Sequence, residues 1–125
     1  MDRSNARTVL AVDDEEAVLT LLTHQLSNLR CVFIPTSSAA EAIHILKTRE
    51  VAVLLCDLNM PNIDGNTVLA VAREQNPNIV PIVISGNTDH NAIIRAVNEG
   101  GIWKYITKPW RRDEVVGLVG EAVAR

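Results

Sequence analysis

Five short apolar runs alternate with five stretches of helical pattern in this chain, and that alternation limits the fold to a small set. The expected strands are residues 8–12, 31–35, 52–56, 80–84 and 102–107, and the expected helices are 13–26, 39–48, 66–75, 89–98 and 111–124. Regular alternation with short connections is typical of a parallel sheet covered by helices on both faces. Right-handed crossovers then restrict the order of the strands. We therefore expect an α/β fold with one doubly wound, five-stranded parallel sheet.

The composition favours a single domain with an aliphatic core. Of the 125 residues, 47% are hydrophobic and only 3% are aromatic, so the core must consist of Val, Leu, Ile and Ala. A chain of this length buries roughly two-thirds of its unfolded surface, which is enough for a sizeable core. We expect residues 1–7 to be a flexible N-terminal segment and residues 8–125 to form the domain. The net charge of −3 argues against a direct role in nucleic-acid binding, which requires a basic surface.

Cysteine usage and the apolar pattern favour a cytoplasmic protein. Cys31 and Cys56 lie inside apolar runs with no CxxC or Cys/His spacing, so we interpret them as reduced, buried thiols rather than zinc ligands. The first seven residues are polar and lack the apolar region of a secretory signal. No apolar run approaches the roughly 20 residues that a membrane span needs.

Polar and charged side chains follow four of the expected strands directly. Asp13 and Asp14 follow the first strand, Asp57 the third, Ser85 the fourth and Lys108 the fifth. In a parallel α/β sheet these strand ends share one edge, where functional groups collect. Three carboxylates beside one ammonium make a site suited to a divalent cation and a phosphoryl group.

Each of these residues also has a plainer explanation when taken alone. Asp57 could be a turn residue, because Asp is common where a strand ends. Asp13 and Asp14 could be acidic side chains at a helix N-terminus, and Lys108 could be a solvated loop lysine. The four features together are hard to attribute to chance.

Four motifs in order make the chain resemble the receiver domain of response regulators in two-component signalling. They are V-D-D-E at 12–15, L-L-C-D-L-N-M-P at 54–61 with D-G at 64–65, I-S-G at 84–86 and K-Y-I-T-K-P at 104–109. The resemblance extends from Thr8 to the final helix. It implies a flavodoxin-like (βα)5 fold, similar to CheY, with the strand order 2-1-3-4-5.

The resemblance implies a phosphoacceptor and a Mg²⁺ site at this edge. Asp57 is expected to accept the phosphoryl group as a carboxylate nucleophile. Asp14 is expected to ligate Mg²⁺ directly and Asp13 through a bound water. The Asp57 carboxylate and the Asn59 backbone carbonyl would complete the protein ligands, a set of oxygens that suits Mg²⁺.

Further roles follow from the same resemblance. Lys108 is expected to contact a phosphate oxygen, and Ser85 to donate a hydroxyl hydrogen bond to the phosphoryl group. The backbone N–H groups of Leu58 and Gly86 are expected to donate to the remaining phosphate oxygens. The bond between Lys108 and Pro109 is expected to be cis.

The resemblance also implies a switch and a set of partners. Ser85 would be drawn toward the phosphoryl group, and Tyr105 would rotate inward, changing a surface built from residues 89–98, the fifth strand and the last helix. The donor would be a sensor histidine kinase or a histidine phosphotransfer protein. The changed surface would control an output domain or form a homodimer, with no contact to a membrane. The tract 102–110 is similar to receivers attached to cyclic-di-GMP phosphodiesterase or other output domains.

Two alternatives share the same site residues. One is a Mg²⁺-dependent phosphohydrolase with an aspartyl-phosphate intermediate, and the other is a pseudo-receiver that only binds proteins. Asn59 and Asn87 are amides and cannot act as bases toward water, which argues against a fast hydrolase. Clustered carboxylates without a metal are costly, which argues against the binding module. We therefore expect a signalling switch with only its own phosphotransfer and slow dephosphorylation, not an enzyme.

Overall fold

The computed structural model describes residues 6–58, 60, 65–86, 91, 94, 97, 98 and 101–125. The strands are β1 Arg7–Val12, β2 Cys31–Thr36, β3 Val53–Asp57, β4 Val80–Ser85 and β5 Lys104–Thr107; the helices described are α1 Glu16–Gln25, α2 Ala39–Thr48, α3 Gly65–Gln75 and α5 Arg112–Ala124. The helix expected at 89–98 falls mostly outside the described residues.

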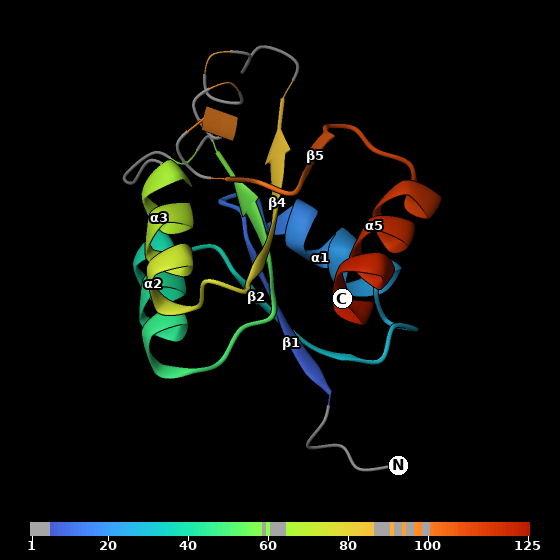
Figure 1. Cartoon of the computed structure of the whole chain (residues 1–125). Coiled ribbons are helices and arrows are strands. Elements are labelled where there is room, and N and C mark those ends of the chain that lie inside the picture. The colour runs from blue at the N-terminus through green and yellow to red at the C-terminus, as the bar shows by residue number, and fades with distance from the viewer. Residues whose placement is uncertain are drawn as a thin grey trace.

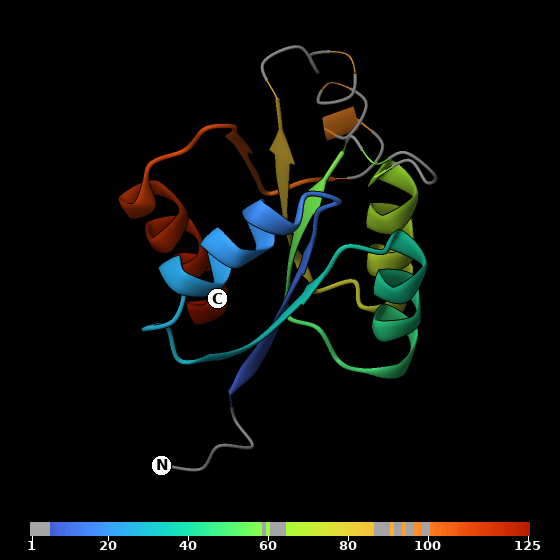
Figure 2. The same ribbon diagram turned by 180° about the vertical axis from the view of Figure 1, so that it is seen from behind.

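The strands form one parallel sheet in the order β2-β1-β3-β4-β5. This order confirms the flavodoxin-like fold that the sequence predicted. Helices α2 and α3 cover one face of the sheet, and α1 and α5 cover the other (Figure 1). The view from behind shows α1 and α5 side by side across the sheet from the first pair of helices (Figure 2). None of the helices in the described part of the chain is long and apolar enough to cross a bilayer.

Each face of the sheet carries its own apolar cluster. Along β3, Leu54 and Cys56 pack toward α2 and α3, whereas Val53 and Leu55 pack toward α1 and α5. This alternation follows from the two-residue period of a strand. All four side chains are fully buried, which explains why the central strand reads as a continuous apolar run.

The helix starts match the sequence pattern at some points and differ at others. Ser38 caps α2 as predicted, because its hydroxyl oxygen accepts a hydrogen bond from the Glu41 N–H at 3.1 Å. The first helix begins at Glu16 rather than at Asp13. The Asp13 carboxylate instead accepts a hydrogen bond from the Glu15 N–H at 2.9 Å and forms a turn before the helix.

The N-terminus of α3 lies against the backbone that follows β3. A Cβ atom added at Gly65 would lie 2.5 Å from the Asp57 carbonyl oxygen and 2.7 Å from the Leu58 Cα atom. Both neighbours are backbone atoms, so neither can yield by rotating a side chain. Glycine at this position therefore allows α3 to approach the carboxyl end of β3.

We predict that Gly65→Ala destabilises the domain by about 1–3 kcal/mol, because the new methyl group must displace backbone. The matched control is Gly117→Ala in α5, where an added Cβ atom meets nothing within 4 Å. That control should gain about 0.5–1 kcal/mol from its higher helix propensity. Urea denaturation of the three proteins measures both changes. Equal stability of Gly65→Ala and the unchanged protein would show that the contact is not tight.

Candidate functional site

Three carboxylates converge at the carboxyl edge of the sheet. Asp13 follows β1 directly, Asp57 is the last residue of β3, and Asp14 comes one residue after Asp13. One carboxylate oxygen from each lies within 4.8 Å of the others. Asp13 and Asp57 are buried, and Asp14 is exposed. Two of the three carboxylates are therefore fixed inside the protein, and one is open to solvent.

The Lys108 ammonium lies among these carboxylates. Its Nζ atom is 3.0 Å from Asp13 Oδ2 and 3.6 Å from Asp57 Oδ2. The backbone N–H of Lys108 donates a hydrogen bond to the Ser85 carbonyl oxygen at 2.8 Å, which fixes the chain after β5 to the end of β4. The peptide bond between Lys108 and Pro109 is cis, as the resemblance implied. The acidic residues and Lys108 thus lie close together in the structure, as the sequence predicted.

The pKa values of two groups reflect this crowding. Burial raises the pKa of the Asp13 carboxyl above its ordinary value, and the hydrogen bond from the Glu15 N–H and the Lys108 ammonium offset this only in part. Burial acts to lower the pKa of Lys108, but contacts with Glu15, Asp13 and Asp57 outweigh it, so the pKa of Lys108 is raised. Lys108 therefore remains a cation throughout the neutral pH range.

A buried hydroxyl lies at the end of the neighbouring strand. Ser85 is the last residue of β4 and is fully buried, and its Oγ atom has no hydrogen-bond partner among the described residues. In the sheet register, Asp57 pairs with Ile84, so Ser85 stands one position beyond the phosphoacceptor candidate. A buried hydroxyl without a partner is costly, which makes Ser85 a ready donor for an anion placed at this edge.

The remaining predicted residues fall into three groups. The Leu58 N–H, which the sequence assigned to a phosphate oxygen, donates to the Ile84 carbonyl oxygen at 3.2 Å and is already used within the sheet. Gly86 follows Ser85 and is partly buried, and Tyr105 lies in β5 with 53% of its surface exposed. The Asn59 carbonyl and Asn87 lie outside the described residues.

The sequence reasoning missed Glu15 as a member of this site. Its Oε1 atom accepts a hydrogen bond from Lys108 Nζ at 2.9 Å, the shortest of the three carboxylate contacts of Lys108. The signal was present, because Glu15 follows the acidic pair at the same sheet edge. In the sequence, Glu15 stands out only as the last residue of the V-D-D-E motif at 12–15.

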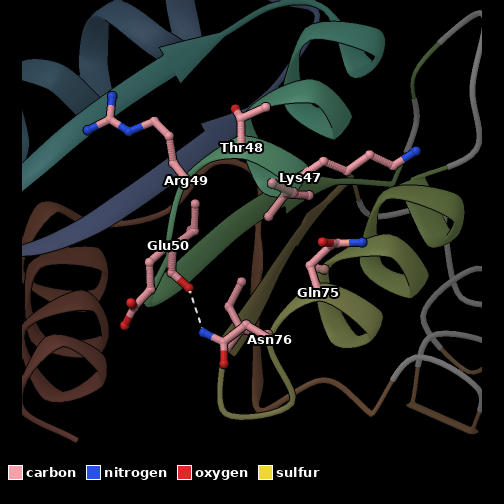
Figure 3. A pocket seen from close by; sticks show the side chains of 10 residues that line it. Lys47, Thr48, Arg49, Glu50, Gln75 and Asn76 are labelled. Carbon is pink, nitrogen blue, oxygen red and sulfur yellow. Dashed lines mark hydrogen bonds between the residues drawn. The ribbon is translucent and has the colours of Figure 1, made fainter.

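A separate hollow of about 410 Å³ lies at the other end of the sheet, between the ends of α2 and α3. Figure 3 shows its labelled cations, Lys47 and Arg49, pointing away from each other rather than toward a common point. The side-chain amide of Asn76 donates a hydrogen bond to the Val51 carbonyl oxygen at 3.0 Å. The cations of this hollow do not point toward a common position where a ligand could bind. The acidic edge of the sheet therefore remains the candidate site.

Comparison with known proteins agrees with this site. The family profile described as the response regulator receiver domain matches residues 9–119. The hydrogenase transcriptional regulatory protein HoxA of Cupriavidus necator is 46% identical over 116 residues, and the DNA-binding transcriptional regulator NtrC of Escherichia coli K12 is 28% identical over 116 residues. Each alignment covers 93% of this chain and 24% of the relative. The chain thus spans about a quarter of the length of these regulators.

A solved structure is similar over nearly its whole length. The signal receiver domain of an HD domain-containing protein from Pseudomonas fluorescens Pf-5 superposes with a TM-score of 0.88 at 32% identity. The alignment covers 95% of each chain. A CheY-like receiver domain protein from Methanospirillum hungatei has a TM-score of 0.87 at 21% identity and supports the fold alone.

We predict that Lys108→Met lowers the free energy of unfolding by about 1–3 kcal/mol, because Asp13 and Asp57 lose the cation that compensates for their burial. This range is below that for a fully buried pair because the Lys108 side chain is 21% exposed. The contribution is present in full below the ordinary lysine pKa of 10.5 and declines as the pH rises through the higher folded value. Urea denaturation at neutral pH measures the loss.

The control for this prediction is Arg111→Met, which removes an exposed ion pair with Asp113 at 3.5 Å. Exposed pairs contribute little, so the control should keep nearly the stability of the unchanged domain. If Lys108→Met is as stable as this control, the ammonium does not compensate for the buried carboxylates.

Proposed function

The chain belongs to the response regulator receiver domain family, and on that premise we propose that Asp57 is its phosphoacceptor. The domain is a receiver of the kind found in two-component response regulators. The observation that carries the proposal is the position of the buried Asp57 carboxylate beside Asp13, Asp14 and the Lys108 ammonium. No other group of three or more potential metal ligands occurs among the described residues.

The proposed reaction is phosphoryl transfer from a phosphohistidine of a partner protein. A carboxylate oxygen of Asp57 forms the new bond to phosphorus while the bond between phosphorus and the histidine nitrogen breaks. The nitrogen keeps the electron pair of that bond, and the product on Asp57 is an acyl phosphate. The donor is a sensor histidine kinase or a histidine phosphotransfer protein.

The donor set fits a Mg²⁺ ion, because Mg²⁺ takes oxygen ligands and three carboxylates supply them here. Asp14 and Asp57 would hold the ion directly, Asp13 would hold a bound water, and the Asn59 backbone carbonyl would complete the set. When bound, the ion reduces repulsion between the carboxylates and the incoming phosphoryl group.

Lys108 and Ser85 are the protein groups that we assign to the phosphoryl oxygens. The ammonium lies 3.6 Å from Asp57 Oδ2 and can neutralise charge on the transferring group. The Ser85 hydroxyl, which has no hydrogen-bond partner in the described part of the chain, would donate a hydrogen bond to the phosphoryl group. The Gly86 N–H would supply a further donor to the same group.

The phosphoryl group would act as a switch through the charge that it adds, about −1.5 to −2 at neutral pH. Movement of Ser85 toward this charge would shift the end of β4, and the exposed Tyr105 ring on β5 would turn inward. We propose that the changed surface lies around β5 and α5. A free-energy difference of a few kcal/mol between the two forms is sufficient for such a switch.

The output of the switch is proposed from the relatives. The HoxA and NtrC proteins are transcriptional regulators about four times as long as this chain. We propose that this receiver likewise controls an output domain, in the cytoplasm, either directly or through a homodimer. The hydrolase alternative is not favoured, because the amides at 59 and 87 supply no base.

We predict that acetyl phosphate and Mg²⁺ add one phosphoryl group to the domain and that Asp57→Asn abolishes this addition, because an amide is not a nucleophile here. Intact-protein mass spectrometry measures the added mass. Asp113→Asn, at an exposed position in α5, should be phosphorylated like the unchanged protein. Full phosphorylation of Asp57→Asn would rule out Asp57 as the acceptor.

We also predict that Mg²⁺ stabilises the domain and that Asp14→Asn removes this effect. At a concentration ten times the dissociation constant, binding adds about 1.4 kcal/mol to the free energy of unfolding. Thermal unfolding with MgCl₂, compared with NaCl at equal ionic strength, separates binding from screening. Asp113→Asn should respond like the unchanged protein. An undiminished response in Asp14→Asn would exclude that carboxylate as a ligand.

A further inference from the structure

Lys108 is shared between the buried site and an exposed carboxylate. Its ammonium donates a hydrogen bond to Glu15 Oε1 at 2.9 Å and also lies 3.0 Å from the buried Asp13 Oδ2. The Asp57 oxygen is 3.6 Å away, beyond the usual range for an N–H···O bond. The Glu15 side chain is 60% exposed, whereas that of Asp57 is 3% exposed. Glu15 thus holds the lysine from the solvent side of the site.

Backbone contacts fix the position from which Glu15 reaches Lys108. Glu15 is the N-cap residue of α1, and its carbonyl oxygen accepts hydrogen bonds from the N–H groups of Val18 at 3.0 Å and Leu19 at 3.3 Å. Its own N–H donates to Asp13 Oδ1. The Lys108 backbone is fixed in turn to Ser85. The two side chains therefore meet because two ordered backbones bring them together.

A lysine ammonium has three donors, and a phosphoryl group on Asp57 would require at least one of them. The ammonium is held closer to Glu15 and Asp13 than to Asp57, so the contact with Glu15 opposes its approach to a group on Asp57. Bound Mg²⁺ would balance charge on the buried carboxylates, whereas Glu15 is exposed and keeps its own negative charge. Glu15 is then the carboxylate that competes with the phosphoryl group for the lysine.

We propose that Glu15 is a positioning residue that restrains Lys108 and so weakens the hold of the site on a phosphoryl group. This inference rests on the proposed function of Asp57. It assigns a task to a residue whose carboxylate lies outside the predicted metal and phosphate contacts. Glu15 does not touch the reacting atoms and acts only through Lys108.

The test measures binding of beryllofluoride, a phosphoryl mimic, at fixed Mg²⁺ and fixed ionic strength, followed by tryptophan fluorescence. Glu15→Gln should raise the apparent affinity about two- to five-fold, the range expected when an exposed ion pair no longer competes. Glu16→Gln is the matched control, because it removes the same charge one residue further along α1. The effect of Glu15→Gln should exceed that of the control.

Glu15→Asp separates contact from charge. It keeps the carboxylate but is one methylene shorter, so it should lose the contact with Lys108 and raise the affinity as Glu15→Gln does. In a Lys108→Met background, Glu15→Gln should change the affinity no more than Glu16→Gln does, because the lysine for which it competes is gone.

The outcomes distinguish this inference from the proposed function. If the unchanged domain binds beryllofluoride and Glu15→Gln matches Glu16→Gln, the positioning role is wrong and the phosphoacceptor assignment stands. The role is also wrong if the full effect of Glu15→Gln persists without Lys108. If the unchanged domain binds no beryllofluoride with Mg²⁺, the proposed function fails, and this inference fails with it.

Discussion

The crowding of carboxylates around one ammonium is the constraint on which the rest of this structure depends. A parallel sheet ends its strands at a common edge, so Asp13 and Asp57 are brought together while both are buried. Two buried anions are tolerated only with a cation close by, and Lys108 supplies it from the end of the edge strand β5. The same excess of negative charge suits the divalent cation that we propose for this edge. Folding and chemistry therefore draw on the same charges.

Most of the fold could be predicted from the sequence, because periodicity is a property of local residue order. The runs around Leu54 and Ile82 are apolar on both faces, which only a strand covered by two layers of helices explains. The proximity of Asp57 and Lys108 could be predicted because parallel strands end at one edge of the sheet. The boundaries of α1 were less accurate, because the carboxylate of Asp13 caps a turn instead of entering the helix.

The parts that the sequence did not reveal depend on side-chain direction and backbone pairing. In the sequence Glu15 is one more acidic residue near a helix start, and only the folded structure shows that its side chain reaches a lysine 93 residues away. The N–H of Leu58 seemed available by position, but the ladder between β3 and β4 extends one residue further and uses it. The close approach of Gly65 to β3 also left no mark in periodicity. These features arise from three-dimensional packing that no local pattern encodes.

The approach of α3 to the end of β3 has a mechanical consequence. No room is left for even a methyl group between Gly65 and the Asp57 carbonyl oxygen, so the main chain at the end of β3 is packed directly against α3. Charge added to the Asp57 side chain cannot be relieved by retreat of that strand toward α3. If Asp57 accepts a phosphoryl group as proposed, the response would instead be directed toward the end of β4, where the Ser85 hydroxyl has no hydrogen-bond partner among the described residues. The packing of Gly65 would thus make β4, rather than β3, the strand that carries a change at this edge toward β5.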